Sequence, residues 1–199
     1  MLIFEPSQSL PNSTQSAVVA LGNFDGVHLG HQVVLGRAQQ QARKLNKPFG
    51  VVTFEPHPRS IFSPADAPFR ITPVHTKRRI LSELGVDVCF EIPFTYDFSK
   101  HTANYFIEDV LIKNLRISHA VAGHDFVFGH KRTGTMRLLN DVMKKHNLGV
   151  DEIAPVKDVA HVLWSSTRIR EDLQKGIPKQ AAMALGRTWE IEGDVLRGA

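Results

Sequence analysis

Residues 17–31 read Ala-Val-Val-Ala-Leu-Gly-Asn-Phe-Asp-Gly-Val-His-Leu-Gly-His, and this stretch decides the fold class. Its first five residues are apolar, do not alternate with polar residues and are closed by Gly22, which is typical of a strand buried on both faces. A helical pattern follows from His31 to about Leu45. A buried strand that leads through a glycine-rich turn into a helix is the first half of a β-α-β unit.

The same alternation continues along the chain. It predicts an α/β fold with a parallel sheet of about five strands and helices on both faces. In such a sheet the ligand binds beyond the carboxyl ends of the strands, near the point where strand order reverses. Further strands are predicted over residues 49–54, 86–92, 118–122 and 150–154, and further helices over 72–84, 99–115, 135–147, 166–175 and 178–185.

Composition narrows the class of protein. The chain has 199 residues, 42% of them hydrophobic, and a net charge of +4. This is enough for one domain and a little more, and the charge is too modest and too spread to favour nucleic-acid binding. A single cysteine, Cys89, excludes a disulfide within the chain. No apolar run spans a membrane and no signal peptide is recognisable, so a cytoplasmic protein without nucleic-acid or membrane partners is predicted.

The pattern changes after Leu185. Residues 186–199 alternate with a period of two and contain several glycines, like the opening strand of a β-rich unit. They are either a last edge strand of the same sheet or the start of a second domain. Periodicity alone leaves this open.

The glycine-rich turn is built to hold a phosphate. Gly22, Gly26 and Gly30 allow sharp bends, and the helix that follows presents its amide groups and the positive end of its dipole. Neither G-x-G-x-x-G nor a P-loop lysine is present; instead His28 and His31 lie one helical turn apart. These histidines could also be metal ligands, with Asp25 as the obvious third ligand, or play a purely structural role.

A second segment, Trp164–Arg170, indicates a bound anion on grounds separate from the glycine-rich turn. Ser166 or Thr167 is a plausible N-cap, which places Arg168 and Arg170 in the first helical turn. Cations there oppose the helix dipole, so a bound anion is indicated. The alternative is that both side chains extend into solvent.

Four motifs in order carry a family resemblance. They are GNFDGVHLGHQ (22–32), FEPHPR (54–59), GHDFVFG (123–129) and SSTRIR (165–170). Together they resemble the adenylyltransferase half of the bacterial bifunctional riboflavin kinase/FAD synthetase family, from about residue 17 onward. The histidine motif alone would indicate only the nucleotidylyltransferase superfamily.

The resemblance implies a division of the chain. Residues 1–185 would form a Rossmann-like nucleotidylyltransferase domain, and residues 186–199 would be the truncated start of the β-rich riboflavin kinase domain. LGRTWEIEGDVLRG (185–198) resembles the first strands of that domain. A kinase domain is then expected C-terminally in the full-length protein, and this chain, if complete, should lack kinase activity.

The resemblance also implies a reaction: FMN and ATP give FAD and pyrophosphate, with Mg²⁺. His28 and His31 would hold the ATP phosphates and stabilise charge in the transition state, while Arg170 would bind the leaving phosphates. Asp25 would also assist Mg²⁺. The remaining ATP-binding residues implied are Gly22, Asn23, Phe24, Asp25, Gly30, Ser166 and Thr167.

Flavin contacts are expected from two loops. His57 and Pro58 follow a strand end that two prolines stiffen, and Asp125, Phe126 and Phe128 belong to the third motif. The phenylalanines would offer flat faces to the isoalloxazine ring, or else pack in the core. In the family, arginine is commoner where Val127 lies, which weakens any phosphate contact from that position.

Basic residues outside the motifs leave two interpretations open. Lys131, Arg132 and Arg137 form either a phosphate-facing lip or a solvated surface, and the run Lys77–Arg79 is typical of a solvated helix face. Two other functions compete with FAD synthesis: adenylyl transfer to another phosphorylated acceptor, and non-catalytic binding of a nucleotide or nucleic acid.

Overall fold

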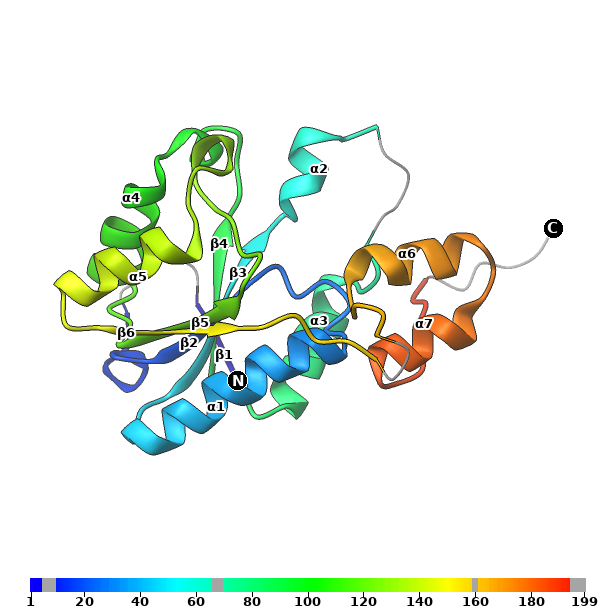
Figure 1. Cartoon of the computed structure of the whole chain (residues 1–199), viewed down its shortest axis with the longest axis horizontal. Helices are drawn as coiled ribbons and strands as arrows, with labels where there is room; N and C mark the ends of the chain where they lie inside the picture. Colours follow the sequence, from blue (N-terminus) through cyan, green and yellow to red (C-terminus); the bar gives the residue numbers. More distant parts are fainter. Residues whose placement is uncertain (5–9, 66–69, 159–160, 194–199) are drawn as a thin grey trace.

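The computed structural model describes residues 1–4, 10–65, 70–158 and 161–193, around a six-stranded parallel sheet (Figure 1). The strand order is β1-β4-β3-β2-β5-β6, so the order reverses between β2 and β5. The strands are β1 (Leu2–Phe4), β2 (Val18–Leu21), β3 (Phe49–Glu55), β4 (Val88–Pro93), β5 (His119–Gly123) and β6 (Gly149–Ile153).

Helices cover both faces of the sheet, as predicted. Alternate residues of β2 face opposite sides: Val18 and Ala20 pack with α1 (Leu29–Leu45) and α3 (Val74–Glu83), whereas Val19 and Leu21 pack on the other side. That other side is covered by α4 (Ala103–Tyr105), the π-helical segment η3 (Phe106–Asn114) and α5 (Met136–Lys145) (Figure 1). Single-turn 3₁₀ segments are η1 (Asn12–Thr14), η2 (Phe98–Lys100) and η4 (His130–Arg132).

Three details differ from the sequence prediction. The sheet has six strands instead of about five, because β1 is only three residues long and too short to show a pattern. The short helix α2 (Pro58–Phe62) follows β3 directly and was not predicted. Helix α3 begins at Val74 with Pro73 as its N-cap, two residues after the predicted start.

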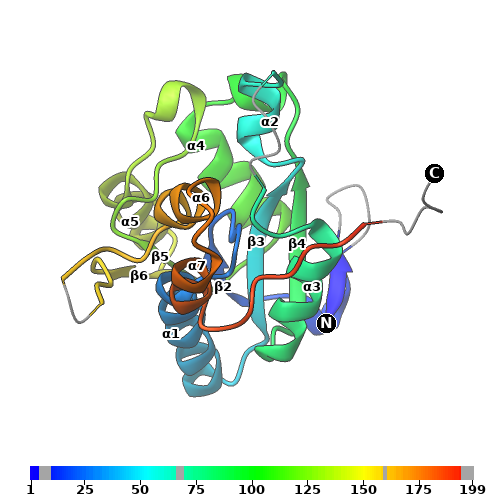
Figure 2. The same ribbon diagram turned by 90° about the vertical axis from the view of Figure 1, so that its right-hand side faces the viewer.

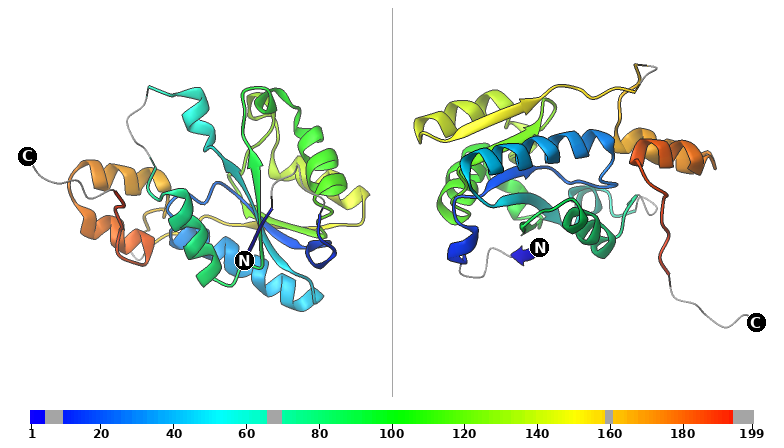
Figure 3. Two further views of the ribbon diagram at one scale, coloured as in Figure 1. Left: turned by 180° about the vertical axis from the view of Figure 1, so that it is seen from behind. Right: turned by 90° about the horizontal axis from the view of Figure 1, so that it is seen from below.

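The last two helices form a small unit of their own. Helices α6 (Ser166–Gln174) and α7 (Pro178–Leu185) pack together near the N-terminal end of α1 (Figure 3). Their apolar contacts, among Ile71, Ile169, Ala181 and Leu185, form a core separate from those of the sheet. None of the helices in the described ranges is long and apolar enough to cross a membrane.

Residues 186–193 extend beyond α7 and pass beside α3 (Figure 2). They join no strand of the sheet, so the edge-strand interpretation is wrong for this described part of the segment. The other interpretation, a division at residue 185 with the start of a β-rich domain after it, stays a prediction, and its last residues, 194–199, lie outside the described ranges.

Candidate functional site

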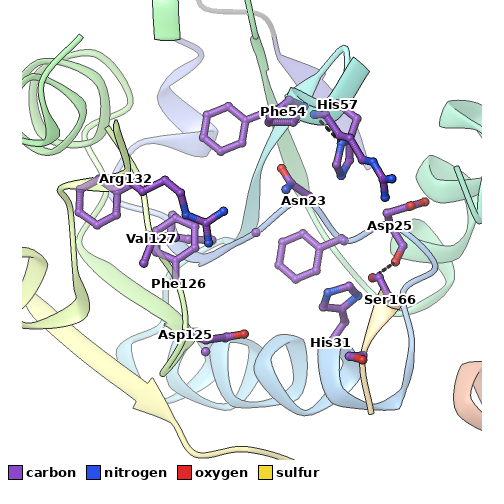
Figure 4. A pocket seen from close by; sticks show the side chains of 18 of the residues that line it. Asn23, Asp25, His31, Phe54, His57, Asp125, Phe126, Val127, Arg132 and Ser166 are labelled. Carbon is purple, nitrogen blue, oxygen red and sulfur yellow. Dashed lines mark hydrogen bonds between the residues drawn. The ribbon is translucent and has the colours of Figure 1, made fainter. Parts of the chain in front are cut away.

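A cavity of about 1080 Å³ opens at the carboxyl ends of the strands, where strand order reverses. Its walls come from the turn after β2, the loop after β3, the loop after β5 and the start of α6 (Figure 4). Every site residue predicted from the sequence lines it: Gly22, Asn23, Phe24, Asp25, His28, Gly30, His31, His57, Pro58, Asp125, Phe126, Phe128, Ser166, Thr167 and Arg170.

The turn between β2 and α1 is tight and strained. Gly26 has φ +88°, and two residues with side chains, Phe24 (φ +51°) and Val27 (φ +41°), also adopt the left-handed region. A branched residue such as Val27 rarely does so unless its surroundings hold it there. At Gly30 a Cβ atom would come within 3.1 Å of the His28 ring and of the Trp164 carbonyl, so this glycine allows the close approach.

The turn brings the two imidazoles together. Their rings stack with centroids 3.6 Å apart, and the edge of Phe24 packs on His31 at 5.2 Å. Nδ1 of His28 caps α1 by accepting a hydrogen bond from the His31 amide at 3.2 Å. Because this nitrogen is an acceptor, the neutral ring must carry its proton on Nε2, which is then a hydrogen-bond donor.

The site keeps its histidines uncharged. Burial lowers the pKa of His28 from 6.5 to about 4, with Asp25 opposing the shift and Arg170 adding to it. Burial, then His28 and Arg170, lower the pKa of His31 well below its usual range. Burial also lowers the pKa of His57 to about 4. At neutral pH these rings act as neutral hydrogen-bonding groups.

Two buried polar atoms at the cavity have no hydrogen-bond partner among the described residues. They are Oδ1 of Asn23 and Nδ1 of His31, from the two ends of the glycine-rich turn. Buried polar groups without partners are costly and rare in folded proteins. A ligand that supplies those partners is the simplest explanation of their position.

Asp25 holds the cavity wall together. Its carboxylate accepts hydrogen bonds from the amides of Ile71 and Thr72 at 3.1–3.3 Å, and from Arg170 at 2.6 Å. Its backbone carbonyl accepts a hydrogen bond from Ser166 Oγ at 2.8 Å (Figure 4). The first and fourth motifs therefore meet at this residue.

The start of α6 differs from the prediction in its cap. Ser165 is the N-cap, and its hydroxyl accepts a hydrogen bond from the Arg168 amide, which leaves Ser166 to contact Asp25. The two arginines do not extend into solvent. Arg168 pairs with Asp158 at 2.8 Å and lies over the Trp164 ring, whereas Arg170 pairs with Asp25 beside the histidines. Carboxylates thus offset the unfavourable dipole interaction at this terminus.

Lys77 contradicts the expectation of a solvated helix face. It is 4% exposed, and its ammonium group donates to Thr53 Oγ1 at 3.3 Å and Glu55 Oε2 at 3.2 Å. Thr53 in turn donates to the carbonyl of Asn23. Lys77 therefore places a buried positive charge under the glycine-rich turn; charge periodicity missed it because the acidic partner comes from a distant strand.

Aromatic side chains line the other end of the cavity. Phe126 and Phe128 stack with centroids 5.4 Å apart, but Phe128 is only 6% exposed and packs in the core, so Phe126 offers more surface. A cluster of further aromatic residues was not predicted from the sequence; they come from β3, α2, the loop after β4, η2 and η3. Its members that line the cavity are Phe54, Phe62, Phe94, Tyr96, Phe98 and Phe106.

The basic residues near this end divide into two groups. Lys131 and Arg132 line the cavity, as do Phe126 and Val127 of the same loop (Figure 4). The Arg137 side chain is 93% exposed and lies outside the lining. The Asp125 side chain, at 84%, is also largely exposed.

The side chains do not form a metal site of their own. In residues 1–4, 10–65, 70–158 and 161–193 there is no group of three or more His, Cys, Asp or Glu side chains placed to hold an ion. Both carboxylate oxygens of Asp25 already accept hydrogen bonds. Asp25 therefore does not fit the role of a direct Mg²⁺ ligand in this arrangement.

Comparison with known proteins agrees with this geometry. Residues 10–168 match the family described as FAD synthetase. The chain belongs to the FAD synthetase family. A bifunctional riboflavin kinase/FMN adenylyltransferase from Buchnera aphidicola is 33% identical over 198 residues, which cover 100% of this chain and 64% of the relative.

Two solved structures resemble the fold of this FAD synthetase family member. A macrolide-efflux protein from Streptococcus pneumoniae is 29% identical with a TM-score of 0.81, covering 94% of this chain and 60% of that one. A pantoate–β-alanine ligase from Francisella tularensis is 14% identical with a TM-score of 0.54 over 92% of this chain and 86% of its own, which shows a shared α/β fold alone. The chain spans about three fifths of the length of the curated relatives it matches.

Proposed function

We propose that this chain transfers the AMP group of ATP to FMN, giving FAD and pyrophosphate. The observation that carries the proposal is the convergence of all four sequence motifs on one cavity, where two buried polar atoms lack partners. Membership of the FAD synthetase family supports the same reaction.

The reaction needs positioning and charge stabilisation more than a nucleophilic side chain. An oxygen of the FMN phosphate attacks the α-phosphorus of ATP, and the bond between that phosphorus and the oxygen bridging to the β-phosphate breaks. Negative charge builds on the α-phosphoryl oxygens and on the leaving pyrophosphate. His28, through its Nε2 proton, and His31 would donate hydrogen bonds to these oxygens.

Arg170, Ser166 and Thr167 would bind the leaving phosphates from the start of α6, beside the histidines. Arg170 is 16% exposed and fixed by Asp25, so its charge is already oriented before the substrate binds. We assign Asp25 a positioning role, holding Arg170 and the wall of Ile71 and Thr72. Mg²⁺ would enter with the ATP phosphates, and we assign none of its ligands to this chain.

FMN would occupy the aromatic end. The flat face of Phe126 and the ring cluster around Phe54 suit an isoalloxazine ring, which is large, planar and mostly apolar on its faces. His57 and Pro58 would lie between this ring and the phosphates. Nδ1 of His57 accepts a hydrogen bond from the Arg59 amide, so the neutral ring carries its proton on Nε2.

The direct test is incubation of the purified chain with FMN, ATP and Mg²⁺, followed by chromatography for FAD and by a pyrophosphate assay. Equal amounts of both products are expected. Turnover with another phosphorylated acceptor but not with FMN would identify a different nucleotidylyltransferase, and binding of ATP without turnover would identify a non-catalytic module.

We further propose that FMN reaches this site from a riboflavin kinase domain. The relative's name includes a riboflavin kinase activity, and that protein is longer than this chain. Replacing FMN by riboflavin in the same assay tests whether the chain alone supplies that step; no FAD is expected.

A further inference from the structure

The segment after α7 contacts the glycine-rich turn from outside the cavity. The Arg187 guanidinium donates a hydrogen bond from Nη2 to the Gly26 carbonyl at 2.8 Å. Its Nη1 lies 3.5 Å from the Val27 carbonyl oxygen and 3.4 Å from that of Leu185. Arg187 itself does not line the cavity, so any effect on a bound nucleotide must pass through the turn.

Two of the carbonyls that Arg187 contacts, those of Gly26 and Val27, belong to the part of the turn with positive φ. Gly26 and Val27 both have positive φ and are buried. Buried carbonyl oxygens need hydrogen-bond partners, and strained backbone persists only where its surroundings fix it. Arg187 provides the partner for Gly26, while Gln32 donates to the Val27 carbonyl at 3.0 Å.

Fixing the Gly26 carbonyl also fixes the direction of the Val27 amide, which belongs to the same peptide group. In a planar trans peptide the N–H points opposite to the C=O. With the Gly26 carbonyl held toward Arg187, the Val27 amide donates to the Phe24 carbonyl at 3.1 Å, which closes the turn immediately before His28. The guanidinium thus holds the backbone that sets the position of the capping histidine.

A neighbouring residue of the same segment contacts the other support of the site. The Trp189 indole donates to the Ile71 carbonyl at 3.0 Å, and the Ile71 amide donates to Asp25, the residue that holds Arg170. Arg187 therefore contacts the glycine-rich turn that places His28, and Trp189 contacts Ile71, which holds Asp25 and through it Arg170.

We infer that Arg187 is a positioning residue for nucleotide binding, which holds the Gly26–Val27 backbone so that His28 meets the triphosphate of ATP. The inference rests on the proposed function for the identity of the nucleotide. It also makes Arg187, which follows the last helix, a support of the cavity wall from outside.

The test compares Arg187→Ala, Arg187→Lys and a matched control, Arg37→Ala. Arg37 is a more exposed arginine of α1 that pairs with Asp151. Arg187→Ala should raise the KM for ATP and the calorimetric Kd for a non-hydrolysable ATP analogue at least tenfold, with the KM for FMN within threefold of wild type. Arg187→Lys, which keeps one donor but not the fork, should recover part of the affinity. Arg37→Ala should stay within twofold.

Amide hydrogen exchange over residues 22–31 gives a readout independent of turnover. It should accelerate in Arg187→Ala and not in Arg37→Ala. A lower Tm with unchanged analogue affinity and unchanged exchange would overturn the inference and leave Arg187 a merely structural role. If Arg187→Ala does not fold, unchanged analogue affinity in Arg187→Lys would have the same meaning. If the wild type makes no FAD, the proposed function fails, while the binding and exchange measurements still decide the role of Arg187.

Discussion

The two ends of the cavity are built differently. At the phosphate end, Asp25 and His28 are each 5% exposed, and hydrogen bonds or ion pairs fix Asp25, His28 and Arg170. At the aromatic end, Phe62 is 60% and Tyr96 64% exposed, and Phe62 contacts Phe94 ring to ring. Charge stabilisation demands fixed donors in a dry site, whereas a planar ring needs only matching surfaces.

This difference is tested most severely by removing both imidazoles. His28→Ala/His31→Ala should lower kcat/KM for FAD formation by at least about 1000-fold, because each donor to a developing charge is worth roughly 100- to 1000-fold. Circular dichroism and the Tm should show a folded protein. Activity within tenfold of wild type would mean that the phosphate end is not where the chemistry occurs.

A pH experiment tests whether the phosphate end is dry. The pKa of His28 is about 4 in the folded chain and near 6.5 when unfolded, so the unfolded chain binds the proton first as the pH falls. The free energy of unfolding should therefore decrease between pH 6.5 and 4, by roughly 3 kcal/mol from this group. Urea unfolding of wild type and His28→Asn, which keeps a capping acceptor, measures it. Equal losses in both proteins would show that His28 is not buried uncharged.

Two arginines of α6 provide a matched pair for the next test. Arg170→Ala should lower kcat/KM for ATP roughly 10- to 100-fold, because an oriented charge facing the phosphates is lost. Arg168→Ala removes the same charge two residues away, where it pairs with Asp158, and should change activity by less than about threefold. Steady-state kinetics of both variants measure the change in kcat/KM for ATP. Equal effects of the two substitutions would argue against the assignment of Arg170.

The smallest expected effect belongs to the aromatic end. Phe126→Ala should raise the KM for FMN about fivefold, in line with the loss of one ring contact, while the KM for ATP stays unchanged. The unchanged KM for ATP is the internal control. A larger effect on ATP than on FMN would reverse the assignment of the two ends.

The sequence was informative where local chemistry decides structure. Glycines followed by paired histidines predict the turn, its helix and two neighbouring imidazoles without reference to the rest of the chain, and the structure agrees. Contacts between distant segments were not predictable in this way. The burial of Lys77 depends on Glu55, and the arginines of α6 find carboxylates at Asp25 and Asp158.

Prediction was also poor where a residue's role depends on its neighbours in space. The contact of Arg187 with Gly26 joins segments that are far apart in the sequence, and nothing in the alternating pattern after Leu185 indicates it. Phe126 and Phe128 share a motif, yet only packing decides that Phe128 belongs to the core and Phe126 has more surface to offer.

A crystal structure with a non-hydrolysable ATP analogue and FMN tests the central claim most directly. We predict phosphate oxygens of the analogue within about 2.7–3.2 Å of His28 Nε2, with Arg170 facing the same phosphates and the flavin ring against Phe126. A triphosphate bound elsewhere, with the two stacked imidazoles facing no phosphate, would contradict the account.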